Sequence, residues 1–91
     1  MDFEWDEAKA ERNLARHGMD FLDAVSVFLD PQRIETEDDR VDYGERRFTT
    51  IGMVEHMLLI VVFTNRGEST RIISARTAES HERRAYHESA R

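Results

Sequence analysis

Residues 57–64 read MLLIVVFT, and they contain the longest apolar run in the chain. The run is rich in side chains that favour strands, and it is far shorter than the ~20 apolar residues that a membrane-spanning helix needs. A strand this apolar is normally covered on both faces and lies in the middle of its sheet. The sequence therefore predicts that these residues form a central strand.

Further strands are expected on both sides of this run. Residues 46–53 alternate in hydrophobicity, and residues 70–76 follow a turn at 65–68 that contains a glycine. A short strand is expected at 34–37, before a solvated loop at 37–40. Because short connections favour antiparallel hairpins, the four strands predict an antiparallel sheet.

Two helices are expected before the strands. Asp6 is a good N-cap for a helix that runs to about His17 and ends at Gly18. Asp20 caps a second helix over residues 21–29, whose apolar residues recur at helical spacing.

A third helix is expected from a cap at Thr77 or Ser80 to the C-terminus. Its apolar residues are small except for Tyr86, so we expect it to be the least stable helix, held by polar contacts or by a partner. The whole predicts an α+β fold in one domain, residues 1–91: two N-terminal helices packed on a four-stranded twisted antiparallel sheet, with a C-terminal helix.

Charge is unevenly distributed along the 91 residues. The net charge is −6, but residues 1–45 hold 5 basic and 14 acidic side chains, whereas residues 46–91 hold 8 basic and 5 acidic ones. Every basic residue of the second half is an arginine, whose planar fork suits phosphate. The alternative is ordinary asymmetry of surface charge. The absence of cysteine and of an apolar leader fits a soluble cytoplasmic protein.

The first helix carries one candidate set of functional residues. Lys9, Asn13 and His17 follow one another at i, i+4 spacing and share a stripe. This stripe is interpreted as an edge that binds phosphate and transfers protons, because histidine titrates near neutral pH. The alternative is a solvated stripe whose histidine interacts with the helix end.

The strand at 70–76 and the last helix carry a second set. Arg71 and Arg76 point to opposite faces of a regular strand, so they line one site only if a bulge intervenes or if Arg76 lies beyond the strand end. Glu82 and Tyr86 are one turn apart, beside Arg83. A carboxylate, a phenol and arginines together suit a 2′-hydroxyl and a phosphate, whereas ion pairing and packing are the structural alternative. No metal-ligand motif is present, and no metal or cofactor is expected.

Four blocks of the chain resemble the BrnT family. The opening FEWDEAKAERNLARHG (3–18) is similar to the family pattern F-x-W-D-x-x-K-x-x-x-N-x-x-K-H-G, with arginine in place of the last lysine. A second helix ending in FLD (28–30), the stretch RRFTTIG (46–52) and TRIISARTAESHERRAY (70–86) resemble the later blocks in the same order.

The resemblance implies a ribonuclease toxin of a type II toxin–antitoxin system. It implies a RelE-like fold, metal-independent cleavage of RNA, inhibition of translation, and neutralisation by a BrnA-type antitoxin in a complex expected to be a heterotetramer. Its motif positions include Lys9, Asn13, His17, Arg71, Arg76, Glu82, Arg83 and Tyr86. Among these, our hypothesis assigns catalytic roles to Lys9, His17, Arg71, Arg76 and Glu82, and substrate binding to Asn13, Arg83 and Tyr86. The expected reaction is attack of an RNA 2′-hydroxyl on the adjacent phosphate, with the arginines stabilising charge and His17 or Glu82 transferring the proton.

Two other functions compete with this one. In the first, the chain is a non-catalytic module whose arginine-rich half docks a protein or RNA. In the second it is a DNA-binding regulator, which is weaker because the sequence has no helix-turn-helix with a basic recognition helix.

Overall fold

The fold is one five-stranded sheet with helices on both of its faces. A computed structural model describes residues 2–38 and 44–89. Strand order in the sheet is β1-β5-β4-β3-β2, and all neighbours are antiparallel except the parallel pair β1 and β5. In chain order the elements are β1 (Asp2–Glu4), α1 (Glu7–His17), α2 (Phe21–Ser26), the 3-10 helix η1 (Val27–Leu29), β2 (Ile34–Asp38), β3 (Arg47–Val54), β4 (Met57–Arg66), β5 (Ser69–Thr77) and α3 (Ser80–Ser89).

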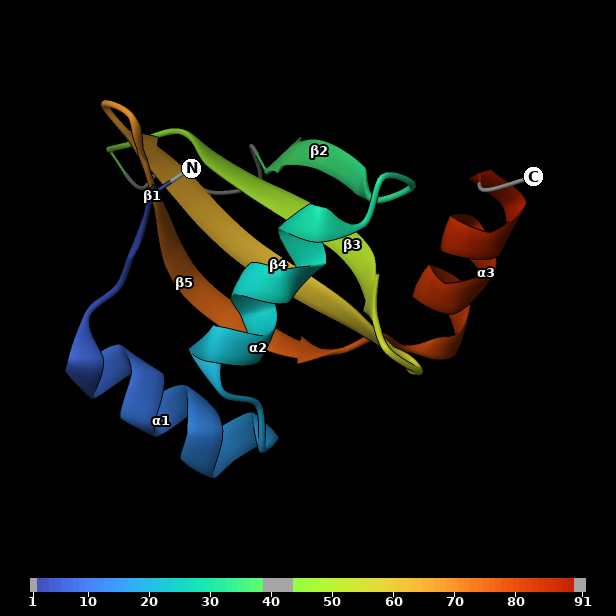
Figure 1. Cartoon of the computed structure of the whole chain (residues 1–91), viewed down its shortest axis with the longest axis horizontal. Helices are drawn as coiled ribbons and strands as arrows, with labels where there is room; N and C mark the ends of the chain where they lie inside the picture. Colours follow the sequence, from blue (N-terminus) through green and yellow to red (C-terminus); the bar gives the residue numbers. More distant parts are fainter. Residues whose placement is uncertain (1, 39–43, 90–91) are drawn as a thin grey trace.

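Strand β4 lies at the centre of the sheet, as its apolar sequence predicts. Its alternate residues enter two different cores. Leu59, Val61 and Phe63 pack with residues of α2 and η1 on one face, whereas Leu58 and Ile60 pack with Tyr86 of α3 on the other. Figure 1 shows α2 crossing in front of the sheet and α3 standing at one end of it. The part of the second face that α3 leaves uncovered is called the open face below.

The helix caps lie where the sequence predicts them. The Asp6 carboxylate accepts from the N–H of Ala8 at 2.9 Å, and Asp20 accepts from the N–H of Leu22 at 2.9 Å. Gly18 ends α1 in the left-handed conformation, with φ of 68°. The second helix spans its expected length but tightens into η1 for its last turn.

The expectation of a four-stranded antiparallel sheet is wrong. A fifth strand, β1, pairs in parallel with the start of β5, so that Phe3 lies beside Thr70 and Glu4 beside Arg71. Three residues are too few to show a hydrophobic period, and nothing within β1 specifies a partner that lies so far along the chain.

Two other expected boundaries also differ. Thr77 is the last residue of β5 and Ser80 the first of α3, so neither is the cap. The N–H of Glu79 instead donates to Glu82 Oε1 at 2.9 Å, which is half of a capping box. In the expected loop 37–40, residues 37 and 38 belong to β2, and residues 39 and 40 lie outside the described residues.

Gly52 of β3 allows the 3-10 helix η1 to approach the sheet closely. A Cβ at this position would lie 2.6 Å from Val27 Cγ1 and 3.2 Å from the Val27 carbonyl oxygen. Glycine at residue 52 therefore sets how closely η1 packs on β3.

Candidate functional site

A β-bulge in β5 brings the two predicted arginines to one face. Ser74 pairs with Val62, but the next pair along is Ile72 with Phe63, which leaves Ile73 as the extra residue. Residues directly opposite in a ladder share a face, and the partners of Arg71, Ser74 and Arg76 are the alternating residues 64, 62 and 60 of β4. All three side chains therefore lie on the open face.

Arg76 and Glu82 form a tight ion pair in a hollow of the open face. Nη1 and Nη2 of Arg76 each donate to a different Glu82 oxygen at 2.8 Å. These hydrogen bonds hold the pKa of Glu82 at about 2, against the opposing effect of its partial burial. The hollow, with a cavity volume of about 350 Å³, is called the sheet hollow and is lined by Thr36, Glu37, Asp38, Thr49, Ile60, Val62, Ser74, Arg76 and Glu82.

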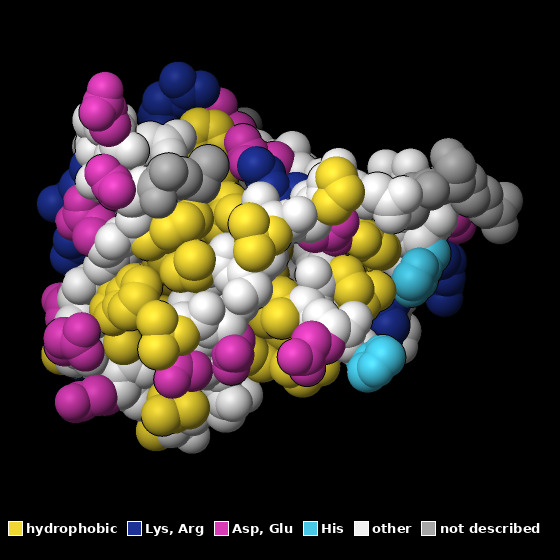
Figure 2. Space-filling model, in the orientation of Figure 1, with side chains coloured by type: hydrophobic (Ala, Val, Ile, Leu, Met, Phe, Trp, Pro, Cys, Tyr) yellow, Lys and Arg dark blue, Asp and Glu magenta, His cyan; other side chains and the backbone are white. Residues whose placement is uncertain are grey.

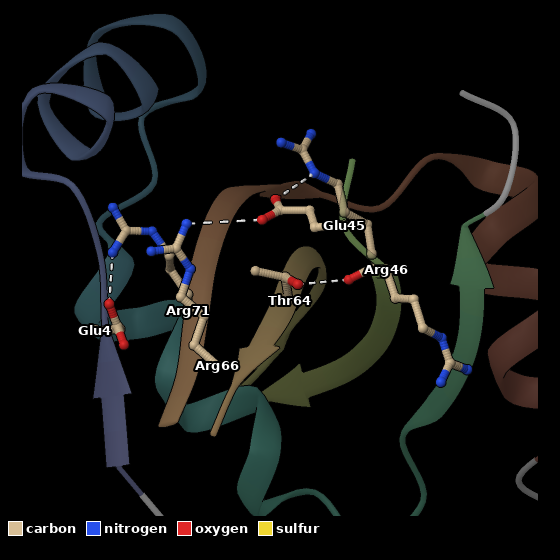
Figure 3. A network of polar contacts seen from close by, with 7 residues as sticks. Glu4, Glu45, Arg46, Thr64, Arg66 and Arg71 are labelled. Carbon is tan, nitrogen blue, oxygen red and sulfur yellow. Dashed lines mark hydrogen bonds and ion pairs between the residues drawn. The ribbon is translucent and has the colours of Figure 1, made fainter. Parts of the chain in front are cut away.

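Arg71 lies towards the other end of β5 and is engaged differently. Its Nη1 donates to Glu4 Oε2 at 2.6 Å, a contact that joins β1 to β5. Figure 3 shows Arg71 beside Arg66, whose guanidinium reaches Glu45 at 3.8 Å. Arg71 does not line the sheet hollow.

The polar stripe of α1 lines a separate groove against the edge of β5. This region is called the helix groove, and it has a cavity volume of about 600 Å³ and is lined by Lys9, Arg12, Asn13, Ala15, Arg16, His17, Ile73 and Ser74. Its described lining residues include one lysine, two arginines and one histidine but no carboxylate. Lys9, Asn13 and His17, the three residues of the predicted stripe, all border this groove.

Asn13, predicted to bind substrate, instead holds α1 against the sheet. Its Nδ2 donates to the carbonyl oxygens of Met19 at 3.0 Å and Ala75 at 2.8 Å, and its Oδ1 accepts from the Ala75 N–H at 3.1 Å. The residue is buried, and both N–H groups and the carbonyl oxygen of its amide are occupied. Asn13 therefore positions Lys9 and His17 along the groove.

Tyr86, also predicted to bind substrate, packs inside the second core. Its hydroxyl donates to Asp30 Oδ2 at 2.6 Å, and the same oxygen accepts from the Met53 N–H at 2.8 Å. Burial, together with the contact with Asp30, raises the pKa of Tyr86 to about 12. Arg83 is exposed on α3 and lines neither the hollow nor the groove.

The predicted site residues therefore do not meet around one phosphate-sized hollow. Lys9 and His17 face the helix groove, whereas Arg76 and Glu82 face the sheet hollow. The expectation of a single hollow is wrong because the two regions have different lining residues, with Ser74 as the exception. Ser74 borders both, so the two regions adjoin.

Sequence reasoning did not assign Arg12, Arg16 and Ser74 to the site. Arg12 and Arg16 are i+3 and i+7 from Lys9, which is the spacing of one helical stripe, so the period alone was sufficient to find them. The sequence could not show that Ser74 borders both the groove and the hollow, because this depends on the bulge at Ile73. Among residues 2–38 and 44–89, no three His, Asp, Glu or Cys side chains are grouped to hold a metal, and no helix is long and apolar enough to cross a membrane.

Comparison with known families decides which class of protein has this fold and this site. The family described as "Ribonuclease toxin, BrnT, of type II toxin-antitoxin system" matches residues 5–82, most of the chain. The chain belongs to the BrnT family. Comparison with curated individual proteins gave no significant match.

The matched region of this BrnT-family chain begins at Trp5 and ends within the first turn of α3. It contains Lys9, His17, Arg76 and both surfaces that meet at Ser74. A type II system pairs its toxin with an antitoxin, so the family also implies a protein partner for this chain and RNA as its substrate.

Proposed function

We propose that this BrnT-family chain is a metal-independent endoribonuclease whose reaction takes place where the helix groove meets the sheet hollow. The observation that carries the proposal is the bulge at Ile73, which turns Ser74 and Arg76 onto the open face while Ser74 still borders the groove. An RNA strand that crosses β5 at Ser74 contacts Lys9 and His17 on one side and Arg76 on the other.

In the proposed reaction the RNA 2′-oxygen attacks the adjacent phosphorus and the bond to the 5′-oxygen breaks. His17 accepts the 2′ proton, and the leaving 5′-oxygen takes a proton from water, which gives a 2′,3′-cyclic phosphate and a 5′-hydroxyl. Lys9 contacts the phosphate, and Arg76 stabilises the charge that develops on its oxygens. Arg71, predicted to share this role, lines neither region and pairs with Glu4, so it takes no part in this step.

Glu82 acts by positioning Arg76 and does not transfer the proton. A carboxylate whose pKa is about 2 and whose two oxygens accept from Arg76 is a poor base at neutral pH. This leaves His17 as the proton-transfer group, because it is exposed in the last turn of α1 and borders the groove.

Cleavage of cellular RNA by this site is proposed to inhibit translation in the cytoplasm. A BrnA-type antitoxin is proposed to neutralise the toxin in a heterotetramer. The competing function is a binding module without catalysis. One observation favours this binding module: Arg71 pairs with Glu4, and Arg76 pairs with Glu82. Ion pairs of this kind also occur where arginines have only a structural role.

The test is to incubate the purified protein with single-stranded RNA in the presence of EDTA and to identify the fragment ends by mass spectrometry. We expect cyclic phosphate ends, and a rate at least about 100-fold lower in His17→Ala and Arg76→Ala. Arg66→Ala, which removes a guanidinium outside both regions, is the matched control and is expected to cleave normally. RNA that is bound but left intact by the wild-type protein would support the binding module instead.

A further inference from the structure

Among the residues that the structure describes, the cations of α1 differ from those in and near the sheet because they form no ion pairs with acidic side chains. Six arginines pair with carboxylates at N–O distances of 2.6–3.8 Å, and all lie in or next to strands: Arg33, Arg46, Arg47, Arg66, Arg71 and Arg76. Within residues 2–38 and 44–89, Lys9, Arg12 and Arg16 make no such pair. These three cations therefore form a cluster of positive charge in a chain whose net charge is −6.

The helical period places the cations of α1 away from the acidic residues of the same helix. At about 100° per residue, Glu7 and Glu11 lie roughly 160° around α1 from Lys9, on the opposite side of the helix. Arg12 and Arg16 lie within about 60° of Lys9, so all three cations project from one side. This side faces the helix groove, whose described lining residues include no carboxylate.

The groove combines this cationic row with an apolar wall. Lys9, Arg12 and Arg16 follow one another along the helix axis at intervals of about 4.5 and 6 Å. Ala15 of α1 and Ile73 of β5 contribute apolar surface to the lining of the groove. Proteins that bind single-stranded nucleic acid likewise use a positively charged groove that follows the backbone phosphates.

We propose that Arg12 and Arg16 form a binding site for the backbone phosphates of single-stranded RNA, outside the phosphate that reacts. The proposal rests on the proposed function for the choice of RNA as the ligand. The groove continues from the reacting position at Ser74 along α1, so the bound strand runs beside the helix. The enzyme therefore takes a single strand several nucleotides long, and it gains affinity from phosphates that it does not cleave.

The test measures binding without cleavage. A fluorescent 12-nucleotide 2′-O-methyl RNA cannot undergo 2′-hydroxyl attack, and its affinity is measured by anisotropy between 50 and 200 mM salt. Each phosphate contact on a single strand contributes a slope of about −0.7 to the dependence of log K on log salt. The double variant Arg12→Gln/Arg16→Gln is expected to bind more weakly than the wild type at low salt. The magnitude of its slope should be smaller by about 1.4. Raising the salt from 50 to 200 mM should therefore reduce the affinity of the variant by a factor about sevenfold smaller than for the wild type.

Arg84→Gln is the matched control for one lost charge. Arg84 is exposed on α3 and, like Arg12, makes no ion pair within the described residues. It is expected to bind RNA as the wild type does, and circular dichroism verifies that all variants are folded. Wild-type affinity and slope in the double variant would overturn the proposal, as would a groove that binds only the antitoxin. Normal binding without cleavage of unmodified RNA would refute the proposed function and leave this site standing.

Discussion

Asn13 shows how a single buried amide determines where functional side chains lie. Its side chain makes the hydrogen bonds that a neighbouring strand would make at the edge of β5: it donates to the Ala75 carbonyl oxygen and accepts from the Ala75 N–H. The same amide holds the Met19 carbonyl and so fixes the chain between α1 and α2. Lys9 and His17, one turn away on either side, are placed along the groove by this contact.

Replacing Asn13 with Ala should destabilise the protein by roughly 2–4 kcal/mol, because three hydrogen bonds are lost and buried backbone groups of β5 are left unpaired. Urea unfolding followed by circular dichroism measures the loss. Asn65→Ala, which changes an exposed asparagine at the end of β4, is the control. An unfolding free energy within about 0.5 kcal/mol of the wild type would show that Asn13 does not hold the helix.

At the scale of elements, α3 is attached by a small core and two carboxylate contacts. Tyr86 is its one buried residue, and Ala78 joins the same cluster just before the helix begins. Arg76 with Glu82 fixes the first turn, and Tyr86 with Asp30 fixes the second. These contacts between side chains provide what the small apolar face of the helix does not.

Tyr86→Phe should loosen α3 more than the rest of the fold. The variant keeps the buried ring but removes the donor to the Asp30 carboxylate, a hydrogen bond to a charged group worth about 1.5–3 kcal/mol. Faster hydrogen exchange at the amides of residues 84–89, with little change in β4, is the expected result. His81→Ala alters an exposed residue of the same helix and serves as the control. Equal acceleration in α3 and β4 would contradict a local role.

At the scale of the whole molecule, opposite charges are unevenly distributed over the surface. On the face that Figure 2 shows, hydrophobic and acidic side chains predominate, and Lys and Arg lie mostly towards its edges. The acidic first half of the sequence nevertheless contributes the cationic side of α1. Net charge alone therefore does not indicate where an anionic ligand binds.

Stability of the whole molecule should fall in acid between about pH 5 and pH 2. The pKa of Glu82 is about 2 in the folded state, below the ordinary value of 4.5, so its stabilising contribution is complete above pH 4.5 and is lost as pH falls through 2. We expect this residue to account for roughly 1–3 kcal/mol, discounted for the partial exposure of the pair. Hydrogen bonds that lower the pKa of Asp30 despite its burial act in the same direction.

Urea unfolding at a series of pH values measures this dependence in the wild type and in Glu82→Gln. The variant should lose less stability between pH 5 and pH 2. Glu88→Gln, at an exposed position of the same helix, should follow the wild type. A Glu82→Gln curve with the wild-type slope would exclude the ion pair as a source of acid sensitivity.

Much of the fold was predictable from the sequence because it depends on residues close together in the chain. Asp6 and Asp20 cap helices through N–H groups two or three residues away, and Gly18 ends α1 through its own conformation. The apolar composition of β4 alone predicted its central place. The stripe of Lys9 and His17 followed from the helical period in the same way.

Tertiary structure alone decided which of these side chains meet. Glu4 pairs with Arg71 across 67 positions of sequence, Asn13 with Ala75 across 62, and Tyr86 with Asp30 across 56. The bulge at Ile73 reverses the facing of Arg71 relative to Arg76, and one extra residue in a strand leaves no local pattern to detect. Local sequence determines the period and the ends of an element, whereas partners, register and facing depend on the free energy of packing distant segments together.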